Sequence, residues 1–293
     1  TFAEKHILPR TQQAIADQLN ITRMRVIKLL EKARQTGIVQ FRISSSLDFR
    51  RDLETRLMEK YHLRDCYTVP TNPNEAGTND TIASATSIYI ADHVRENSYI
   101  NFGYGDTTSK TIEYLARNLE TAVSFVSLTG GVGYYLPKSE SNIFNAKLYL
   151  IPAPIIMSSA QMADAIKKEN SVQEVTNMIR LASMTIIGIG GMDDSATIVK
   201  SSILNPSDFR LLAMKGAVGD VICHFIDKDG NLVDTEVDSR LVSVPLNTLK
   251  ELDNVIGVAA GKHKLSAIHA ALTGGYIDIL ITDEDTAAQL CRI

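Results

Sequence analysis

The stretch YINFGYGDTTSKT, residues 99–111, decides the fold class of this chain. Its first half is largely apolar and ends in a turn marked by Gly103 and Gly105. Thr107, Thr108 and Ser109 follow, which are residue types that begin helices well. The pattern therefore predicts a strand, a tight glycine turn and a helix. Such units build α/β proteins with a parallel sheet.

The same alternation continues to the end of the chain. Strands are expected at residues 66–70, 99–105, 122–130, 147–154, 184–191, 219–226, 254–261 and 277–283. Helices are expected near residues 79–95, 107–119, 160–182 and 263–272. This order predicts a Rossmann-like, mostly parallel sheet that is covered by helices on both faces.

The segment of residues 10–43 differs from this α/β body in charge and in pattern. Residues 1–43 carry a net charge of +5, whereas the whole chain carries −4, so the remainder carries −9. Thr11 can cap a short helix that runs to Gln18, and Asn20 suits the tight turn after it. Thr22 can cap a second helix, whose inner apolar stripe consists of Val26, Leu29, Leu30 and Ala33. Residues 38–43 alternate as a short strand. This layout predicts a winged helix-turn-helix.

The second helix of this segment carries the residues that we expect to bind duplex DNA. Thr22, Arg23 and Arg25 lie in its first turn. A helix that enters a major groove presents this turn to the base edges. Lys28 and Lys32 lie further along and are placed to contact phosphates. The alternative is a small helical hairpin that packs on the α/β body.

Three regions follow along the chain: a DNA-binding domain at residues 1–45, a linker helix at 46–64 and a ligand-binding domain at 65–293. The chain begins with Thr1 rather than Met, so we expect part of the first domain to precede it. Leu47, Leu53, Leu57 and Tyr61 form the apolar stripe of the linker helix. This helix is either a spacer or an oligomer contact.

Five loops at expected strand ends are candidates for ligand binding, because ligands of open α/β sheets bind outside the carboxyl ends of the strands. They are residues 102–111 (a phosphate cradle at a helix N-terminus), 127–133 (glycine-rich), 215–221 (with Lys215 and Asp220), 259–268 (with Lys262, His263 and Lys264) and 281–290. Each has a structural alternative: a glycine turn, a tight turn, an exposed charge, or a cap by Asp285 or Thr286.

Several classes of protein are disfavoured by composition. Cys66, Cys223 and Cys291 are too far apart for a metal pair or a disulfide framework, as is usual in the cytoplasm. His224 is expected to be a core or sheet-face residue, and we predict no metal site and no cofactor. The loop at 103–105 lacks the third glycine of a dinucleotide fingerprint. Neither a secretory signal nor a membrane span is expected, so a cytoplasmic protein is predicted.

Several segments together resemble the SorC (DeoR-type) sugar-responsive bacterial transcription regulators. They are ITRMRVIKLLEKARQTGIV, SLTGGVG, IPAP, KGAVGD and GGYIDILITDEDTAAQL, in this order. The C-terminal third is most similar to the branch that represses autoinducer-2 uptake. The resemblance implies an effector domain similar to sugar-phosphate isomerases and deaminases, usually in a tetramer. It also implies that a phosphorylated sugar changes the affinity for a DNA operator.

The resemblance also implies which residues bind the effector. The phosphate loop maps onto Gly105, Asp106, Thr107 and Thr108, the effector-binding acid onto Asp220, and the lysine onto Lys264. Two hypotheses follow. The first is a sugar-phosphate-controlled repressor. The alternative is a sugar-phosphate isomerase or deaminase, with Asp220 as base and Lys264 and Thr107 on the phosphate.

Overall fold

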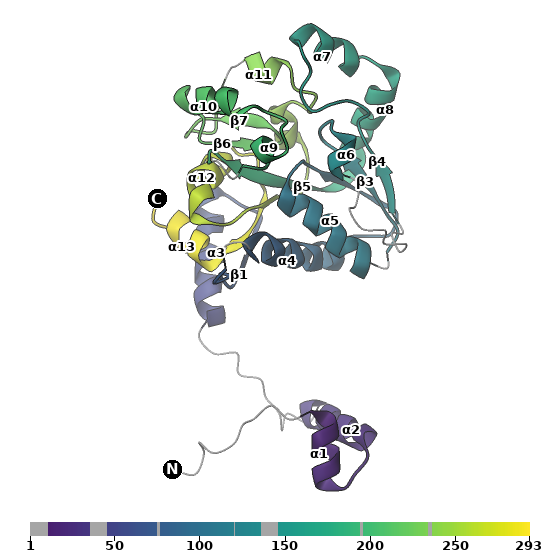
Figure 1. Cartoon of the computed structure of the whole chain (residues 1–293). Helices are drawn as coiled ribbons and strands as arrows, with labels where there is room; N and C mark the ends of the chain where they lie inside the picture. Colours follow the sequence, from purple (N-terminus) through teal and green to yellow (C-terminus); the bar gives the residue numbers. More distant parts are fainter. Residues whose placement is uncertain are drawn as a thin grey trace. The chain divides into compact units, whose positions relative to one another are not determined.

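A parallel sheet of seven strands forms the centre of the larger of two units in this structure (Figure 1). The structure is a computed structural model, and it describes residues 11–35, 46–74, 77–119, 121–135, 146–193, 196–233 and 236–293. Contacts divide the chain into a small unit, Thr1–Leu47, and a large unit, Asp48–Ile293.

The strands of this sheet lie in the order β1-β9-β8-β5-β2-β3-β4, and every pair along this path is parallel. Their bounds are β1 Asp65–Val69, β2 Ser98–Phe102, β3 Val123–Ser127, β4 Ala146–Tyr149, β5 Ala182–Gly191, β8 Val255–Val258 and β9 Ile279–Asp283. The predicted parallel sheet is therefore confirmed. Several strands are shorter than predicted. For example, β4 ends before Pro152 and Pro154, since proline cannot donate to a ladder.

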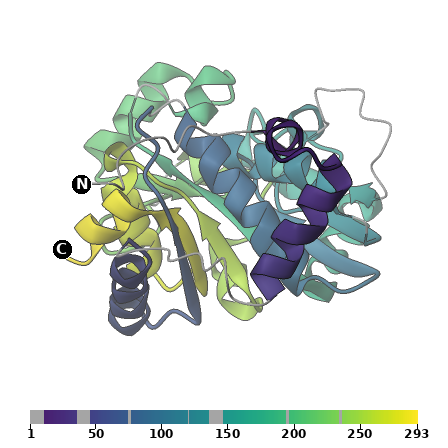
Figure 2. The ribbon, with the colours of Figure 1, turned by 90° about the horizontal axis from the view of Figure 1, so that it is seen from below.

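Helices cover both faces of the sheet, as predicted. On one face, α4 (Thr78–His93) and α5 (Asp106–Asn118) bury Ile82, Ile90, Ile112 and Leu115 against the strands. On the other face lie α3 (Ser46–Tyr61), α8 (Asn170–Met178), α12 (Leu265–Thr273) and α13 (Glu284–Leu290), which share a second core cluster. Figure 2 shows α3 beside the yellow C-terminal helices.

The predicted helix at residues 160–182 is wrong as a single element. The chain forms α7 (Ala160–Lys167), α8 and a 3₁₀ turn (Ile179–Leu181), and Ala182 already opens β5. The break falls at Glu169, whose backbone is extended with φ −63° and ψ 138°. An apolar stripe that two successive short helices share cannot be told from one long stripe by periodicity.

The predicted strand at residues 219–226 is also wrong, because it reverses in its middle. β6 (Gly219–Val221) and β7 (His224–Ile226) form an antiparallel hairpin, and β6 pairs with the end of β5. Its two turn residues, Ile222 and Cys223, have φ of 46° and 68°. Without glycine or asparagine there, the sequence carried no turn signal.

The hairpin belongs to a smaller cluster of elements at the carboxyl end of the sheet. This cluster includes α9 (Thr197–Lys200), α10 (Pro206–Met214) and α11 (Glu236–Ser239), and it buries Phe209, Phe225 and Leu241. The described part of the large unit also contains three short elements: α6 (Val132–Tyr135) and the 3₁₀ turns Leu246–Glu251 and Lys262–Lys264.

The small unit contains α1 (Gln12–Leu19) and α2 (Arg23–Gln35), with the predicted caps. Thr11 Oγ1 accepts a hydrogen bond from Ala14 N–H at 3.2 Å, and Thr22 Oγ1 accepts one from Arg25 N–H at 3.3 Å. Asn20 has the predicted left-handed conformation, with φ 53° and ψ 42°.

The inner stripe of α2 is only partly as predicted. Val26 is buried, but Leu29 is 51% exposed. Ala16 of α1 and Val26 of α2 are buried, whereas a residue away from the line of contact between two helices needs a third element to cover it. The side chains of Leu30 and Ala33, and the strand predicted at residues 38–43, lie outside the described residues.

Candidate functional site

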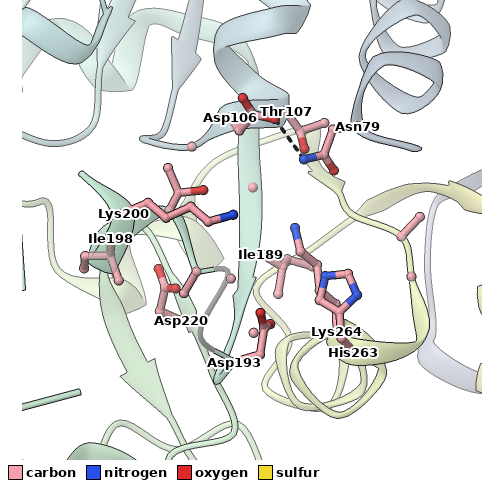
Figure 3. A pocket seen from close by; sticks show the side chains of 18 of the residues that line it. Asn79, Asp106, Thr107, Ile189, Asp193, Ile198, Lys200, Asp220, His263 and Lys264 are labelled. Atoms are coloured by element: carbon pink, nitrogen blue, oxygen red, sulfur yellow. Dashed lines mark hydrogen bonds between the residues drawn. The ribbon is translucent and has the colours of Figure 1, made fainter. Parts of the chain in front are cut away.

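The direction in which the chain crosses the sheet changes between β2 and β5. From β2 the chain proceeds outward to β3 and β4, whereas from β5 it proceeds the other way to β8 and β9. In open parallel sheets a crevice forms at such a point, outside the carboxyl ends of the strands. A cavity of about 760 Å³ lies there, lined by the loops that follow β2, β5 and β8 (Figure 3).

The first wall of this cavity is the turn between β2 and α5. Gly105 has φ 150°, which favours glycine, and its carbonyl accepts hydrogen bonds from Ser109 N–H and Thr108 Oγ1 at 3.0 and 2.9 Å. The Thr108 hydroxyl is thus turned into the protein, while Thr107 lines the cavity. The first amides of a helix have no acceptor within it, so this wall offers hydrogen-bond donors to an anion.

Asp106 lies in this same turn, but its carboxylate is bound by neighbours. Its Oδ2 accepts a hydrogen bond from Asn79 Nδ2 at 2.8 Å and lies 3.4 Å from Lys110 Nζ. Lys110 also contacts Asp80 at 2.9 Å. These contacts draw the Asp106 charge toward α4 and reduce its repulsion of an anion at the turn.

The second wall carries Asp220, from β6. Burial raises the pKa of its carboxyl to about 6. A hydrogen bond from Cys223 N–H at 3.2 Å opposes that rise, as do the electrostatic effects of Lys264 and His224. The carboxylate lies across Gly190 of β5: a Cβ at residue 190 would lie 1.9 Å from Asp220 Oδ1. Glycine at 190 therefore creates the space in which Asp220 faces the cavity.

The hairpin that holds Asp220 is anchored from behind. His224 is buried, with Nδ1 2.6 Å from Asp238 Oδ1 and Nε2 2.8 Å from the Val244 carbonyl. Ser243 Oγ donates to the Ile222 carbonyl at 3.0 Å. These contacts maintain a left-handed turn at residues that disfavour it. They also confirm that His224 is a core residue of the hairpin.

The third wall is the segment between β8 and α12. Gly261 has φ 108°, and its N–H donates to Thr286 Oγ1 of α13 at 2.8 Å. Lys264 lies at the start of α12, with its side chain toward the cavity (Figure 3). Burial lowers the pKa of Lys264, whereas the charges of Asp220, Asp193 and Asp106 oppose that change.

The cavity brings together five of the six residues that the resemblance implied, namely Gly105, Asp106, Thr107, Asp220 and Lys264. Thr108 supports the turn from inside instead. The sequence did not predict three other lining residues, Asn79, Asp193 and Lys200. The one available signal was GIGG at 188–191, since glycines at a strand end mark a close approach.

The candidate loops at residues 127–133 and 281–290 do not line this cavity, and neither does Lys215. At residue 130 a Cβ would lie 2.4 Å from the Pro154 carbonyl, so the glycine-rich loop there is a site of close packing. Lys215 is exposed and outside the cavity. Asp285 and Thr286 do not cap α13: Asp283 does, accepting from Thr286 N–H at 2.8 Å.

In the small unit, the five residues expected to contact DNA are all exposed: Thr22, Arg23, Arg25, Lys28 and Lys32. At about 100° per residue, Arg25, Lys28 and Lys32 fall within an arc of about 60° on α2, and Arg23 lies on another side of the helix. A single basic stripe thus runs along α2.

Two kinds of feature are absent from the described residues. No cluster of three or more His, Cys, Asp or Glu side chains suited to a metal ion occurs among them. None of the helices they form combines the length and the apolar character needed to cross a membrane.

Comparison with known proteins places this geometry in a family. The sequence model Sugar-bind, a sugar-binding domain, matches residues 45–292. The transcriptional regulator LsrR of Escherichia coli (strain K12) is 33% identical over 286 residues, which is 96% of this chain and 90% of that protein. The chain belongs to the SorC/DeoR family of transcriptional regulators.

Other members agree with this assignment. LsrR of Klebsiella pneumoniae subsp. pneumoniae is 33% identical over 288 residues, covering 97% of this chain and 88% of that one. The full-length sorbitol operon regulator SorC from Klebsiella pneumoniae has the same fold, with a TM-score of 0.74 and 24% identity over 96% and 94% of the two chains. A DeoR family transcriptional regulator from Listeria monocytogenes also has this fold, with a TM-score of 0.73 and 22% identity over 82% of this chain and 99% of that one. These solved regulators therefore share the fold on which this chain builds its cavity.

Proposed function

We propose that this SorC/DeoR regulator is a DNA-binding repressor whose operator affinity is controlled by a phosphorylated sugar or sugar-like effector. The observation that carries the proposal is the cavity at the switch point of the sheet. It combines amide donors at the start of α5 with the ammonium of Lys264 and the carboxylate of Asp220. Donors and a cation suit a phosphate, and a carboxylate suits sugar hydroxyls.

The DNA-binding half of the proposal rests on the small unit. The helix pair has the caps and the left-handed Asn20 turn of a helix-turn-helix, and α2 presents an exposed basic stripe. We propose that Thr22, Arg23 and Arg25 contact base edges and that Lys28 and Lys32 contact phosphates. The curated relatives are named transcriptional regulators, which supports this use of the unit.

Repression by a tetramer completes the proposal. Two recognition helices of a dimer would bind a pseudo-palindromic operator, and a tetramer would join two such sites. An effector shifts this equilibrium only if it binds the DNA-competent and DNA-incompetent arrangements with different affinity.

Thermal unfolding with paired sugars tests the effector class. We expect a phosphorylated sugar to raise the melting temperature in proportion to the logarithm of its concentration above Kd, and its non-phosphorylated counterpart to have no effect. Equal effects of both partners, or none from either across a panel of sugar phosphates, would contradict the proposal.

An isomerase-type activity is the alternative. The raised pKa of Asp220 is the observation that favours it, since enzymes tune catalytic bases in this way. Incubating the protein with ribose or glucosamine phosphates and following product by NMR separates the two functions. A regulator binds without turnover.

A further inference from the structure

Helix α3 lies on the two C-terminal helices of the large unit. Its Leu53 and Leu57 are fully buried in the same cluster as Ala271 of α12 and Leu290 of α13. The chain enters the large unit through α3, so this helix is the first element of the large unit after the small one.

Polar contacts hold both ends of α3 in this position. Near its start, Arg50 Nη1 lies 3.2 Å from Glu284 Oε1 of α13, and both side chains are largely buried. At its end, the Tyr61 hydroxyl lies 2.8 Å from His269 Nδ1 of α12, and Lys60 Nζ donates to the Leu290 carbonyl at 3.0 Å. Burial, then the charge of Lys60, lowers the pKa of His269, which disfavours protonation of the ring beside Tyr61.

The same two helices begin at the cavity. Lys264, whose side chain reaches into the cavity in Figure 3, immediately precedes α12. Gly261 lines the cavity, and its N–H is bound by Thr286 in the first turn of α13, two residues from Glu284. One hydrogen bond, the first turn of α13 and one ion pair thus connect the cavity wall to α3.

We propose that Thr286 is a positioning residue: it holds the Gly261 wall of the cavity and couples that wall to α3 through Glu284 and Arg50. The regulatory meaning of this coupling rests on the proposed function. A ligand that orders or displaces the wall would change how firmly α3 is held, and through α3 it would bias the DNA-binding segment.

Hydrogen exchange of the full chain tests the coupling without ligand or DNA. Thr286→Val keeps the volume and removes the acceptor for Gly261 N–H. We expect exchange in peptides of residues 259–264 and 48–61 to become about tenfold faster, the size of effect for one lost buried hydrogen bond, with α5 unchanged.

Thr282→Val is the matched control. Thr282 is equally buried on the preceding strand, and its hydroxyl has no hydrogen-bond partner within the described residues. The proposal is overturned if Thr286→Val accelerates α3 no more than Thr282→Val does. It is also overturned if α5 accelerates as much as α3, because that pattern means general destabilisation.

The reverse experiment starts from α3. Arg50→Gln removes the ion pair with Glu284 and should accelerate exchange at residues 259–264. Arg51→Gln, at the exposed neighbouring position, should leave that segment unchanged. Equal exchange there in both variants would refute the coupling. These measurements need no effector. The coupling can therefore be refuted while a sugar phosphate still binds the protein and weakens its DNA binding, and it can be confirmed even if no sugar phosphate does so.

Discussion

Replacing Asp220 by asparagine should stabilise the large unit while it weakens effector binding. Burial raises the pKa of this carboxyl from 3.8 to about 6. Between about pH 4 and pH 6 the folded state therefore still holds a proton that the unfolded state has already lost. The free energy of unfolding consequently falls as the pH rises through this window. About two pKa units at about 1.36 kcal/mol each give a cost of up to about 3 kcal/mol above pH 6. Asparagine, which does not ionise, removes that cost.

Urea unfolding, followed by far-UV circular dichroism from pH 4 to pH 8, measures this effect. The free-energy difference between Asp220→Asn and the wild type should be near zero at about pH 4 and rise to a plateau of about 2–3 kcal/mol above about pH 6.5. Asp253→Asn is the control, because Asp253 is exposed. A difference that does not change with pH, or a variant less stable than wild type at pH 8, would refute the reasoning.

Three further changes test individual contacts. Thr107→Val removes a hydroxyl that lines the cavity and should weaken sugar-phosphate binding by about 1–1.5 kcal/mol in calorimetry; unchanged affinity would move the phosphate elsewhere. Gly190→Ala puts a Cβ 1.9 Å from Asp220 Oδ1, so it should displace the carboxylate and weaken effector binding at least about tenfold, whereas Gly133→Ala, with nothing within 4 Å, should not. Arg25→Ala should weaken operator binding by about 1–3 kcal/mol in fluorescence anisotropy if its guanidinium binds a base edge, and an equal loss on unrelated DNA would assign it to the phosphates instead.

The sequence predicted the fold well where residues within an element, or directly beside it, determine that element's structure. The strands from β2 to β9 that form the parallel sheet are apolar runs closed by glycine, proline or hydroxyl residues, and a strand buried on both faces needs nothing else. The caps at Thr11 and Thr22 and the left-handed Asn20 are likewise encoded by single residues.

The failures occurred where distant contacts override local preference. No residue type in the turn of Ile222 and Cys223 favours a positive φ; the turn is held by Asp220, Ser243 and surrounding apolar burial. Periodicity does not show such support. The helix predicted at 160–182 failed for a related reason, since its apolar residues continue to face one core through a change of direction at Glu169.

The cavity was predictable only in part. Gly105 and Thr107 could be found because they lie in one contiguous strand–turn–helix segment. Asp220 and Lys264 were candidates among several charged residues at strand ends, and only the family resemblance singled them out. Their meeting at one cavity depends on the order of strands. Asn79 and Lys200 reach it from helices whose sequences carry no ligand signal, so only the assembled sheet brings them in.

The central claim is tested most directly by the affinity of the protein for duplex DNA, with and without sugar phosphates. The DNA sequence is first selected by its binding to the protein at low salt. We predict that at least one sugar phosphate weakens DNA binding about tenfold or more, that its non-phosphorylated form does not, and that Thr107→Val reduces the response. Absence of DNA binding at low salt, or a sugar phosphate that fills the cavity and leaves DNA affinity unchanged, would contradict the account.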